Sequence, residues 1–355
     1  MNLPSLMSAV ELTAHGGPEV LRCREDVATP VPRDGEVLVR VMAAGVNNTD
    51  INTRLGWYAK EAKGATSEGD VHADGAFAGA LDFPRIQGAE FCGRIVAIGA
   101  GVSGWSIGQR VVCPTNQSEA TDAAPTAYVA LGSDYDGAFA QFCRVPARHL
   151  YDVTESQLSD TEIAAMPCAF GTAENLLTRA QVGEGDRVLV TGASGGVGLA
   201  AVQLAKLRGA VVTGQCAASK ADAVREAGAA HILVRDETAA PKSLDVVIDV
   251  VGGPALGGFL EALLPAGRYA VSGAIAGPVV EADLRTIYLN DLTIFGCTYQ
   301  PPSVFQHLVD LINKGLIRPL VSATYPLFEI ARAQADFLSK RYPGKLVLIP
   351  PESNA

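Results

Sequence analysis

Residues 186–198 read Asp-Arg-Val-Leu-Val-Thr-Gly-Ala-Ser-Gly-Gly-Val-Gly, and this stretch decides the fold. The apolar run 188–190 predicts a short buried strand of the kind found in parallel sheets. A helix is predicted to follow up to Arg208, because apolar residues recur there at helical spacing, namely Val197, Ala200, Ala201, Leu204 and Leu207. A strand, a glycine-rich turn and a helix in this order are typical of a phosphate-binding turn.

The turn 193–198 matches the dinucleotide-binding fingerprint, with Ala193 in place of the first glycine. Gly195 would let the backbone approach a pyrophosphate, and Gly198 would let the helix pack against the strand. The first amides of the helix would hold the anion, so the expected contacts are Ser194, Gly195, Gly196 and Val197. The alternative is a tight turn that binds nothing.

The composition excludes several classes of protein. The chain has 355 residues, enough for two domains, and 48% of them are hydrophobic. With a formal net charge of −10 and no cluster of basic residues, we expect no nucleic-acid partner. No apolar run is long enough to span a membrane, and we identify no secretory signal. The seven dispersed cysteines form neither a disulfide framework nor a zinc ribbon, so we expect a reducing, cytoplasmic location.

Before residue 155, closely spaced short strands predict a β-rich, barrel-like domain. These strands are expected at 36–44, 94–99, 108–112 and 137–145. A short helix is expected from Asp50, capped by Thr49 or Asn48. Residues 59–82 lack periodicity and predict a long surface loop, which could shape a binding pocket. Its polar residues Asp70, His72 and Asp74 could suggest a metal site, but a solvated loop is the favoured interpretation.

From residue 155 the pattern alternates strand and helix, which predicts a doubly wound α/β domain. Strands are expected at 188–190, 210–214, 232–234, 244–250, 268–272 and 293–296. A helix at 220–227 should end at Gly228. A helix at 303–314 and a strand at 345–349 return to the first domain. The expected division is therefore residues 1–154 plus 300–355 for one domain, and residues 155–299 for the other.

Four segments together resemble the medium-chain dehydrogenase/reductase superfamily over nearly the whole chain. They are the Gly-x-Glu segment 88–93, the strand start 137–140, the glycine turn 193–198 and the final Gly-Lys-Leu-Val-Leu at 344–348. The resemblance implies a GroES-like barrel domain that binds substrate and a doubly wound, parallel-sheet Rossmann domain that binds the nucleotide.

The zinc-dependent members of this superfamily resemble one another in a catalytic cysteine and a histidine. Here Asn47 or Asn48 stands at the first place and Ala89 at the second, and neither residue type supplies a thiolate or imidazole ligand. The closely spaced cysteines of their structural zinc lobe are also missing, so we expect no metal. The chain is more similar to zeta-crystallin-like quinone oxidoreductases and related enoyl reductases, through 45–47, Asp50 and 56–58.

The end of the second strand of the nucleotide domain predicts the cofactor. An NAD site places an acidic residue there, about twenty residues beyond the glycine turn. This chain has Cys216 instead, followed by Ser219 and Lys220, which suit a 2′-phosphate. The alternative is that Ser219 caps a helix and Lys220 is solvated. The tyrosine that the family often has before Arg235 is missing, although Arg235 could compensate. We predict NADPH.

The resemblance implies further cofactor contacts. In the nucleotide domain these are Thr172, Val251, Gly252, Gly273, Ala274, Cys297 and Tyr299. Lys345 would contact the cofactor at the domain cleft, and Asn47 would approach the nicotinamide ribose from the first domain.

The activity implied is hydride transfer from NADPH to a quinone or to an α,β-unsaturated carbonyl. Reduction of an alkene also needs a proton donor, and Tyr58 is the first candidate, since a phenol is protonated at neutral pH. Asn47 and Asp50 are weaker candidates, and Tyr58 could instead only pack at the base of the loop. The alternatives are a zinc-type alcohol dehydrogenase and a nucleotide-binding protein without a catalytic role. The family implies a homodimer, for which 293–298 could supply an edge strand.

Overall fold

The computed structural model describes residues 3–72, 75, 77 and 81–352. The chain divides into two compact units. Unit 1 consists of Met1–Ala62, Asp70–Cys168 and Pro301–Ala355, and unit 2 consists of Lys63–Gly69 and Ala169–Gln300. Residues 155–168 thus belong to unit 1, whereas the expected boundary placed them with the nucleotide-binding domain. An ion pair ties this segment to unit 1, since Arg110 Nε donates to Asp160 Oδ1 at 2.6 Å.

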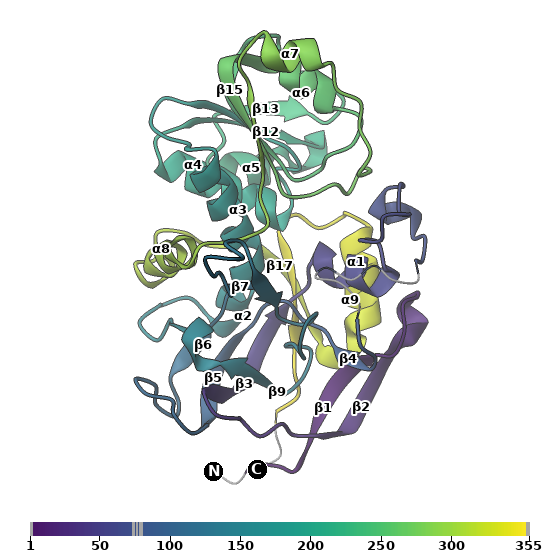
Figure 1. The fold of residues 1–355 in the computed structure, drawn as a ribbon, viewed down its shortest axis with the longest axis vertical. Coiled ribbons are helices and arrows are strands. Elements are labelled where there is room, and N and C mark those ends of the chain that lie inside the picture. The colour runs from purple at the N-terminus through teal and green to yellow at the C-terminus, as the bar shows by residue number, and fades with distance from the viewer. Residues whose placement is uncertain (1–2, 73–74, 76, 78–80, 353–355) are drawn as a thin grey trace. The chain divides into compact units, whose positions relative to one another are not determined.

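Unit 2 is built on a parallel sheet of six strands, of which Figure 1 labels β12, β13 and β15. The strand order is β13-β12-β11-β14-β15-β16, and each neighbouring pair is parallel. The strands are β11 (Arg187–Val190), β12 (Val211–Cys216), β13 (His231–Val234), β14 (Leu244–Asp249), β15 (Leu263–Val271) and β16 (Thr293–Gly296). This arrangement confirms the predicted doubly wound sheet.

Helices cover both faces of this sheet. The helices, in chain order, are α3 (Pro167–Arg179), α4 (Gly196–Leu207), α5 (Ala221–Ala227), α6 (Leu256–Ala262) and α7 (Leu284–Tyr288). The first two residues of α3 belong to unit 1. Gly214 faces α5, because a Cβ there would lie 2.4 Å from Cγ1 of Val224. Gly214 pairs with Val190, whereas the preceding residue Leu189 belongs to a hydrophobic cluster with α6. Since successive side chains of a strand point to opposite faces, α5 and α6 lie on opposite faces.

Within its described residues, unit 1 contains three sheets. A sheet of seven strands has the order β10-β6-β5-β3-β18-β17, with β9 also paired to β3; a second sheet has the order β2-β1-β4, and β7 pairs with β8. The strands are β1 (Leu6–Leu12), β2 (Leu21–Ala28), β3 (Glu36–Gly45), β4 (Arg85–Ile86), β5 (Cys92–Ile98), β6 (Arg110–Val112), β7 (Asn116–Ser118), β8 (Tyr128–Ala130), β9 (Phe142–Pro146), β10 (Tyr151–Asp152), β17 (Val321–Pro326) and β18 (Lys345–Ile349). The helices are α1 (Asn48–Leu55), α2 (Asp160–Ala164), α8 (Pro302–Asn313) and α9 (Ile330–Leu338).

The expected barrel of unit 1 is not closed. Among the strands that the structure describes, β10 and β17 form the two ends of the main sheet and do not pair with each other. The strand β3 is long enough to take β5 on one side and both β9 and β18 on the other. The strand β18, which is far from β3 in the sequence, is therefore its neighbour in the main sheet.

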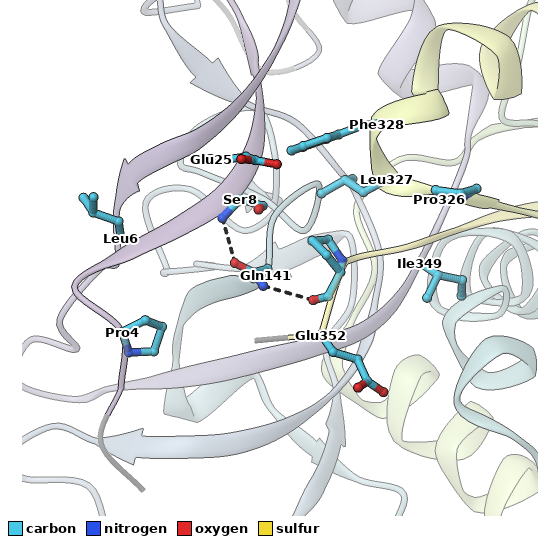
Figure 2. Close-up of a pocket in the computed structure, with 11 residues that line it drawn as sticks. Pro4, Leu6, Ser8, Glu25, Gln141, Pro326, Leu327, Phe328, Ile349 and Glu352 are labelled. Carbon is cyan, nitrogen blue, oxygen red and sulfur yellow. Dashed lines mark hydrogen bonds between the residues drawn. The ribbon is translucent and has the colours of Figure 1, made fainter. Parts of the chain in front are cut away.

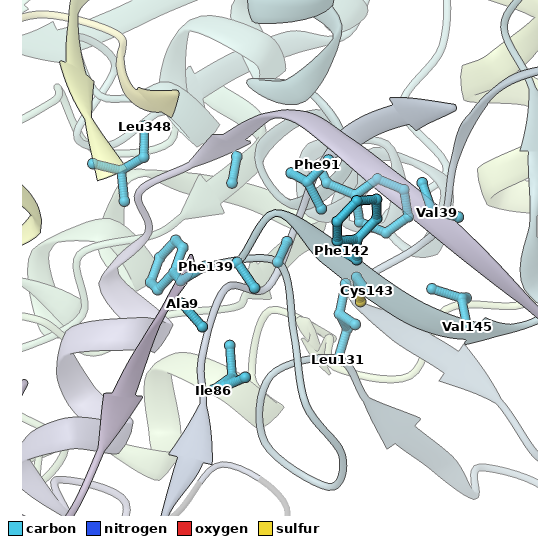
Figure 3. Packing of buried hydrophobic residues seen from close by; sticks show 14 of the residues in the cluster. Ala9, Val39, Ile86, Phe91, Leu131, Phe139, Phe142, Cys143, Val145 and Leu348 are labelled. Carbon is cyan, nitrogen blue, oxygen red and sulfur yellow. The ribbon is translucent and has the colours of Figure 1, made fainter. Parts of the chain in front are cut away.

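One hydrophobic core holds the sheets of unit 1 together. Figure 3 shows side chains from β1, β3, β9 and β18 that belong to this core, together with Phe91 and Phe139 from the connecting segments. Both phenylalanines have no solvent exposure. Burying a side chain of this size stabilises the fold by about 1.5–3 kcal/mol, so this core fixes the segments that carry the polar residues described below.

The predicted strand at 137–145 is wrong in its first half, because regular pairing begins only at Phe142. The preceding residues cross the segment 86–88 instead: Phe139 N donates to Gln87 O at 2.9 Å. Gly88 has a φ of +109° there, and a Cβ on it would lie 2.6 Å from Phe139 N. This close backbone crossing requires a glycine and leaves no room for a continuous strand.

Most other predicted elements lie within two residues of their expected bounds. The predicted cap of α1 was wrong, since Asn47, rather than Thr49 or Asn48, caps the helix in a capping box with Asp50. In the predicted loop 59–82, Lys63–Gly69 groups with unit 2, where Thr66 N donates to Ile275 O at 3.1 Å. Asp74 of the suggested metal site lies outside the described residues.

Candidate functional site

The glycine turn between β11 and α4 has the geometry of an anion-binding turn. Gly192 adopts a φ of +55°, in the left-handed region. A Cβ on Gly198 would lie only 2.2 Å from Gly192 O, so the helix and the turn approach each other too closely for a side chain. Gly195 occupies the N-cap position and supplies no side-chain cap to the twelve-residue helix α4. The amide groups at this helix terminus are therefore available to an anion.

A buried carboxylate that sequence reasoning missed organises the next strand end. Asp249 has no solvent exposure, and its Oδ1 accepts hydrogen bonds from Val251 N at 2.8 Å and Gly252 N at 3.0 Å. Thr191 Oγ1 donates to the same oxygen at 2.6 Å, and the hydroxyl of Tyr269 donates to Oδ2. Asp249 thus holds the loop after β14 against the residue that precedes the glycine turn. A polar residue at the end of an apolar strand was the only sequence signal.

The other predicted contacts in unit 2, apart from Thr172, follow the carboxyl ends of parallel strands. A Cβ on Gly252 would lie 3.0 Å from Gly273 O, so the segments 251–252 and 273–274 lie side by side. Cys297 is buried after β16, and its N donates to Val271 O at 2.9 Å. Tyr299 O accepts from Asn175 Nδ2 at 3.1 Å, and Thr172 is half-buried in α3. The carboxyl edge is where open α/β sheets bind ligands.

The end of β12 is positively charged. Cys216 is buried there, and Lys220, Arg225 and Arg235 each act electrostatically to lower the pKa of its thiol, although burial raises that pKa overall. The pKa of Lys220 is lowered, first by burial and then by repulsion from Arg235. Ser219 is exposed in the same turn. The nearby carboxylate, Asp222, has a side chain that is 93% exposed and forms an ion pair with Arg225 at 2.9 Å.

Unit 1 holds a buried ion pair beside the N-terminus of α1. Lys345, the first residue of β18, is 2% exposed, and its ammonium donates to Glu90 Oε1 at 2.6 Å. The same ammonium donates to Val46 O at 3.0 Å and to Asn47 Oδ1. These bonds use all three protons of the lysine. The structure thus brings Asn47 and Lys345 together, although they are 298 residues apart.

Three donors hold the carboxylate of Glu90. Besides the Lys345 ammonium, Asn47 Nδ2 donates to Oε1 at 2.8 Å and Cys168 N donates to Oε2 at 2.7 Å. Asp50 lies on the other side of Asn47, where its carboxyl accepts from Asn47 N at 2.8 Å and from Ala89 N at 3.2 Å. Burial raises the pKa of Asp50 to about 7, against the bonds from the two amides.

The residues in this cluster do not fit a catalytic zinc ion. Asn47 and Ala89 supply neither thiolate nor imidazole, and the ammonium of Lys345 already neutralises Glu90. Cys168 is half-buried, and burial together with Glu90 raises the pKa of its thiol to about 12. Among the residues that the structure describes, no group of three or more His, Cys, Asp or Glu side chains could hold a metal ion.

Tyr58 lies near this cluster with its hydroxyl 3.3 Å from Thr49 Oγ1, to which it donates. Burial raises the pKa of Tyr58 to about 12, so the phenol stays protonated at neutral pH. Its ring packs edge-on against Trp57 and Phe77, with ring centroids 5.6 Å and 5.1 Å apart. The ring of Tyr58 therefore packs against two aromatic side chains, and its role as a proton donor stays a prediction.

Unit 1 also contains a groove of about 440 Å³ (Figure 2). None of the residues that line it belongs to the polar cluster around Glu90. Its walls come from β1, β2 and the segments around 326–328 and 349–352. The amide of Gln141 in this groove is already satisfied, because it accepts from Ser8 N at 2.7 Å and donates to Pro351 O at 3.0 Å. Both polar atoms of the Gln141 side chain are therefore already hydrogen-bonded within the protein.

The comparisons with known proteins agree with this architecture. The family "Alcohol dehydrogenase GroES-like domain" matches residues 33–155, and "Zinc-binding dehydrogenase" matches residues 196–314. Acryloyl-coenzyme A reductase of Metallosphaera sedula is 30% identical over 356 residues, covering 96% of this chain and 99% of that protein. Quinone oxidoreductase of Mus musculus is 28% identical, covering 97% and 98%. The solved structure of a proposed alcohol dehydrogenase from Sinorhizobium meliloti 1021 has a TM-score of 0.90 and 41% identity, covering 98% of both chains.

A GroES-like unit combined with a Rossmann-type parallel sheet defines a two-domain dehydrogenase. The chain belongs to the medium-chain dehydrogenase/reductase superfamily, and it is an oxidoreductase of that superfamily. No helix in the described part of the chain is long and apolar enough to cross a membrane.

Proposed function

We propose that this protein is an NADPH-dependent, zinc-independent reductase that transfers a hydride to a quinone or to an α,β-unsaturated carbonyl. The observation that carries the proposal is the end of β12. Cys216 stands there in place of the carboxylate that would bind the ribose of NAD. The positive charges of Lys220 and Arg235 lie close enough to Cys216 to lower the pKa of its thiol. Relatives described as quinone oxidoreductase and acryloyl-coenzyme A reductase support the substrate class.

The described residues fit a dinucleotide. The amides of Gly196 and Val197 at the start of α4 would hold the pyrophosphate, beside the buried Ser194. Lys220 and Ser219, with Arg235, would hold a 2′-phosphate. The remaining proposed contacts are Cys216, Thr172, Val251, Gly252, Gly273, Ala274, Cys297 and Tyr299 from unit 2, and Asn47 and Lys345 from unit 1. When bound, the cofactor supplies the hydride.

The residues of this chain would then supply position and protons. Lys345 and Glu90 hold Asn47 in one orientation, which would let Asn47 position the reactants. Tyr58 would donate its phenolic proton to the α-carbon of an unsaturated carbonyl after hydride addition at the β-carbon. A quinone takes its protons from water and needs no such donor, so Tyr58 should separate the two reactions.

The first test is oxidation of NADPH by purified, metal-analysed protein, with an ortho-quinone and an α,β-unsaturated ketone as parallel acceptors and NADH as the control. Turnover with NADPH well above turnover with NADH supports the proposal, and the preferred acceptor identifies the reaction. Tight NADPH binding without turnover of either acceptor would favour the alternative, a nucleotide-binding protein without a catalytic role.

An alcohol dehydrogenase is the second candidate, favoured by the 41% identity to the proposed alcohol dehydrogenase of Sinorhizobium meliloti. That chemistry in this superfamily uses zinc, for which the cluster around Glu90 lacks ligands. We expect dialysis against a chelator to leave NADPH oxidation unchanged. Stoichiometric zinc in the purified protein, with loss of activity on its removal, would establish the second candidate.

Tyr58→Phe tests the proton donor. General acid catalysis contributes on the order of 10²–10⁴-fold, so we expect turnover of the unsaturated ketone to fall by about 10²-fold while the Kd for NADPH stays the same. Phenylalanine keeps the ring contacts with Trp57 and Phe77, so packing is preserved. An unchanged ketone turnover would remove Tyr58 from the mechanism.

We also propose that the protein is a cytoplasmic homodimer. The edge strand β16 carries the 46% exposed Ile294, and α7 with its flanking residues exposes Leu284, Tyr288 and Leu289 by 62–70%. An apolar surface at a sheet edge suits pairing with a second copy. All seven cysteines are free, as expected in a reducing compartment. Ile294→Arg should yield monomers in sedimentation, and wild-type monomers at micromolar concentration would refute the dimer.

A further inference from the structure

A small polar cavity lies against the hydroxyl group that Tyr58 contacts. The cavity has about 10 Å³ of space for the centre of a water molecule, which is roughly what one water requires. The polar residues that line it are Thr49, Asp50, Thr53, Gln87, Thr115 and Ser133. Thr49 therefore contacts Tyr58 and also lines the cavity that Asp50 lines.

One buried acceptor in this wall needs a donor. Among the described residues, Gln87 Oε1 is buried without a hydrogen-bond partner, although Gln87 Nε2 donates to Asp50 O at 2.9 Å. Leaving a buried acceptor unpaired destabilises the fold, because the oxygen has lost its hydrogen bonds to water. A water in the cavity would satisfy this oxygen and would also reach the polar groups of Asp50 and Thr49, and a buried water commonly has about three partners.

The charges of the cluster place an exchangeable proton on Asp50. Lys345 supplies an ammonium that is bonded to Glu90, and Glu90 accepts three hydrogen bonds from the described residues. Asp50 accepts hydrogen bonds from two backbone amides, and it forms no ion pair with a cation among the described residues. A second buried carboxylate beside Glu90 would be uncompensated, and a proton removes that charge.

The electrostatic surroundings agree with this assignment. Burial is the largest cause that raises the pKa of Asp50 to about 7, and Glu90 adds to it, while Lys345 and the amides of Asn47 and Ala89 oppose it. Electrostatic interaction with Cys168 and with Asp50 contributes to the raised pKa of Tyr58. A group that is half-protonated near neutral pH can both give and take a proton.

We propose, on the basis of the function proposed above, that Asp50 is the proton reservoir of Tyr58, connected through one water molecule in the cavity and the hydroxyl of Thr49. After Tyr58 has given its proton to the substrate carbon, Thr49 passes its hydroxyl proton to the phenolate oxygen. The water passes a proton to Thr49 Oγ1, and the Asp50 carboxyl passes its proton to the water. Tyr58, Thr49 and the water return to their starting states, and Asp50 is left as a carboxylate that bulk water reprotonates before the next turnover.

The test compares Thr49→Val with Thr49→Ser in the NADPH-bound enzyme. The matched control is Thr324→Val, which makes the same substitution at an exposed position on β17. Turnover is measured with the unsaturated ketone and with the quinone from about pH 5 to about pH 9, on either side of the pKa of Asp50. In the wild type, ketone turnover should fall as the pH rises through about 7, because the reservoir empties.

Thr49→Val should lower the ratio of ketone to quinone turnover at least about 10-fold and abolish that pH dependence. Thr49→Ser, which keeps the hydroxyl, and Thr324→Val should match the wild type. A Thr49→Val protein with the wild-type ratio and the wild-type pH profile overturns the proposal.

A measurement without turnover separates this proposal from the proposed function. Infrared spectroscopy of the wild type should show a protonated carboxyl band that disappears as the pH rises through about 7, and Asp50→Asn should lack it. The band should persist in Thr49→Val. If the wild type reduces neither acceptor, the proposed function fails, while absence of the band in the wild type, or its presence in Asp50→Asn, overturns the reservoir.

Discussion

Replacing Lys345 by Met tests the buried charge cluster of unit 1. Methionine preserves most of the side-chain volume, so the main loss is the ammonium and its bonds to Glu90, Asn47 and Val46. Hydrogen bonds to charged groups contribute about 1.5–3 kcal/mol each, and removing one partner of a buried ion pair costs about 3–5 kcal/mol, because a charge is left without compensation. We expect the free energy of unfolding of unit 1 to fall by about 3–5 kcal/mol.

Urea denaturation followed by tryptophan fluorescence measures this loss, since both tryptophans of the chain, Trp57 and Trp105, lie in unit 1. The double variant Lys345→Met/Glu90→Gln is the control, because it removes both charges. We expect it to recover at least half of the loss. A loss below about 1 kcal/mol in the single variant, or a double variant as unstable as the single one, would refute the idea that an uncompensated charge dominates.

Three further predictions concern the nucleotide turn and the polar cluster. Lys220→Ala should reduce the preference for NADPH over NADH about 10-fold, equivalent to about 1.4 kcal/mol, in the ratio of kcat/KM values; an unchanged ratio would show that Lys220 does not contact a 2′-phosphate. Gly198→Ala should raise the calorimetric Kd for NADPH at least about 10-fold, since its Cβ would lie 2.2 Å from Gly192 O, whereas Gly257→Ala, with nothing within 4 Å, should bind normally. The pKa of Asp50 is about 7 in the fold, above its unfolded value of about 3.9, so the wild type should lose stability as the pH rises from about 4 to about 7. Asp50→Asn should lack this loss, and equal slopes of unfolding free energy against pH in both proteins would contradict the shifted pKa.

The sequence predicted best what short-range patterns determine. The glycine turn, the C-terminal cap of α5 at Gly228 and the strand β18 at 345–349 all appear as expected. Each depends on a few consecutive residues, such as an apolar run or a glycine that can adopt a positive φ. The capping box of α1 also depends on a few consecutive residues. The sequence offers several adjacent polar residues as the N-cap, and in the structure the N-cap is Asn47.

The sequence could not predict contacts made over long separations. Lys345 and Glu90 are 255 residues apart, and nothing near either residue indicates the other. Gly88 and Phe139 meet only because two segments cross in the core, and this crossing shortened the predicted strand. The cavity beside Asp50 likewise depends on residues from several segments, so its polar lining has no signature in any one stretch.

The pairing of Lys345 with Glu90 also sets an order of events during synthesis. Asn47, Asp50 and Glu90 leave the ribosome early, but the ammonium that neutralises Glu90 comes from the final strand, which pairs with β3 through Val347 and Gly45. Unit 2 draws almost all of its residues from one continuous segment, Ala169–Gln300, and can assemble before Lys345 is made. Until β18 has been made and has paired with β3, Glu90 of the nascent unit 1 lacks the ammonium group that neutralises it.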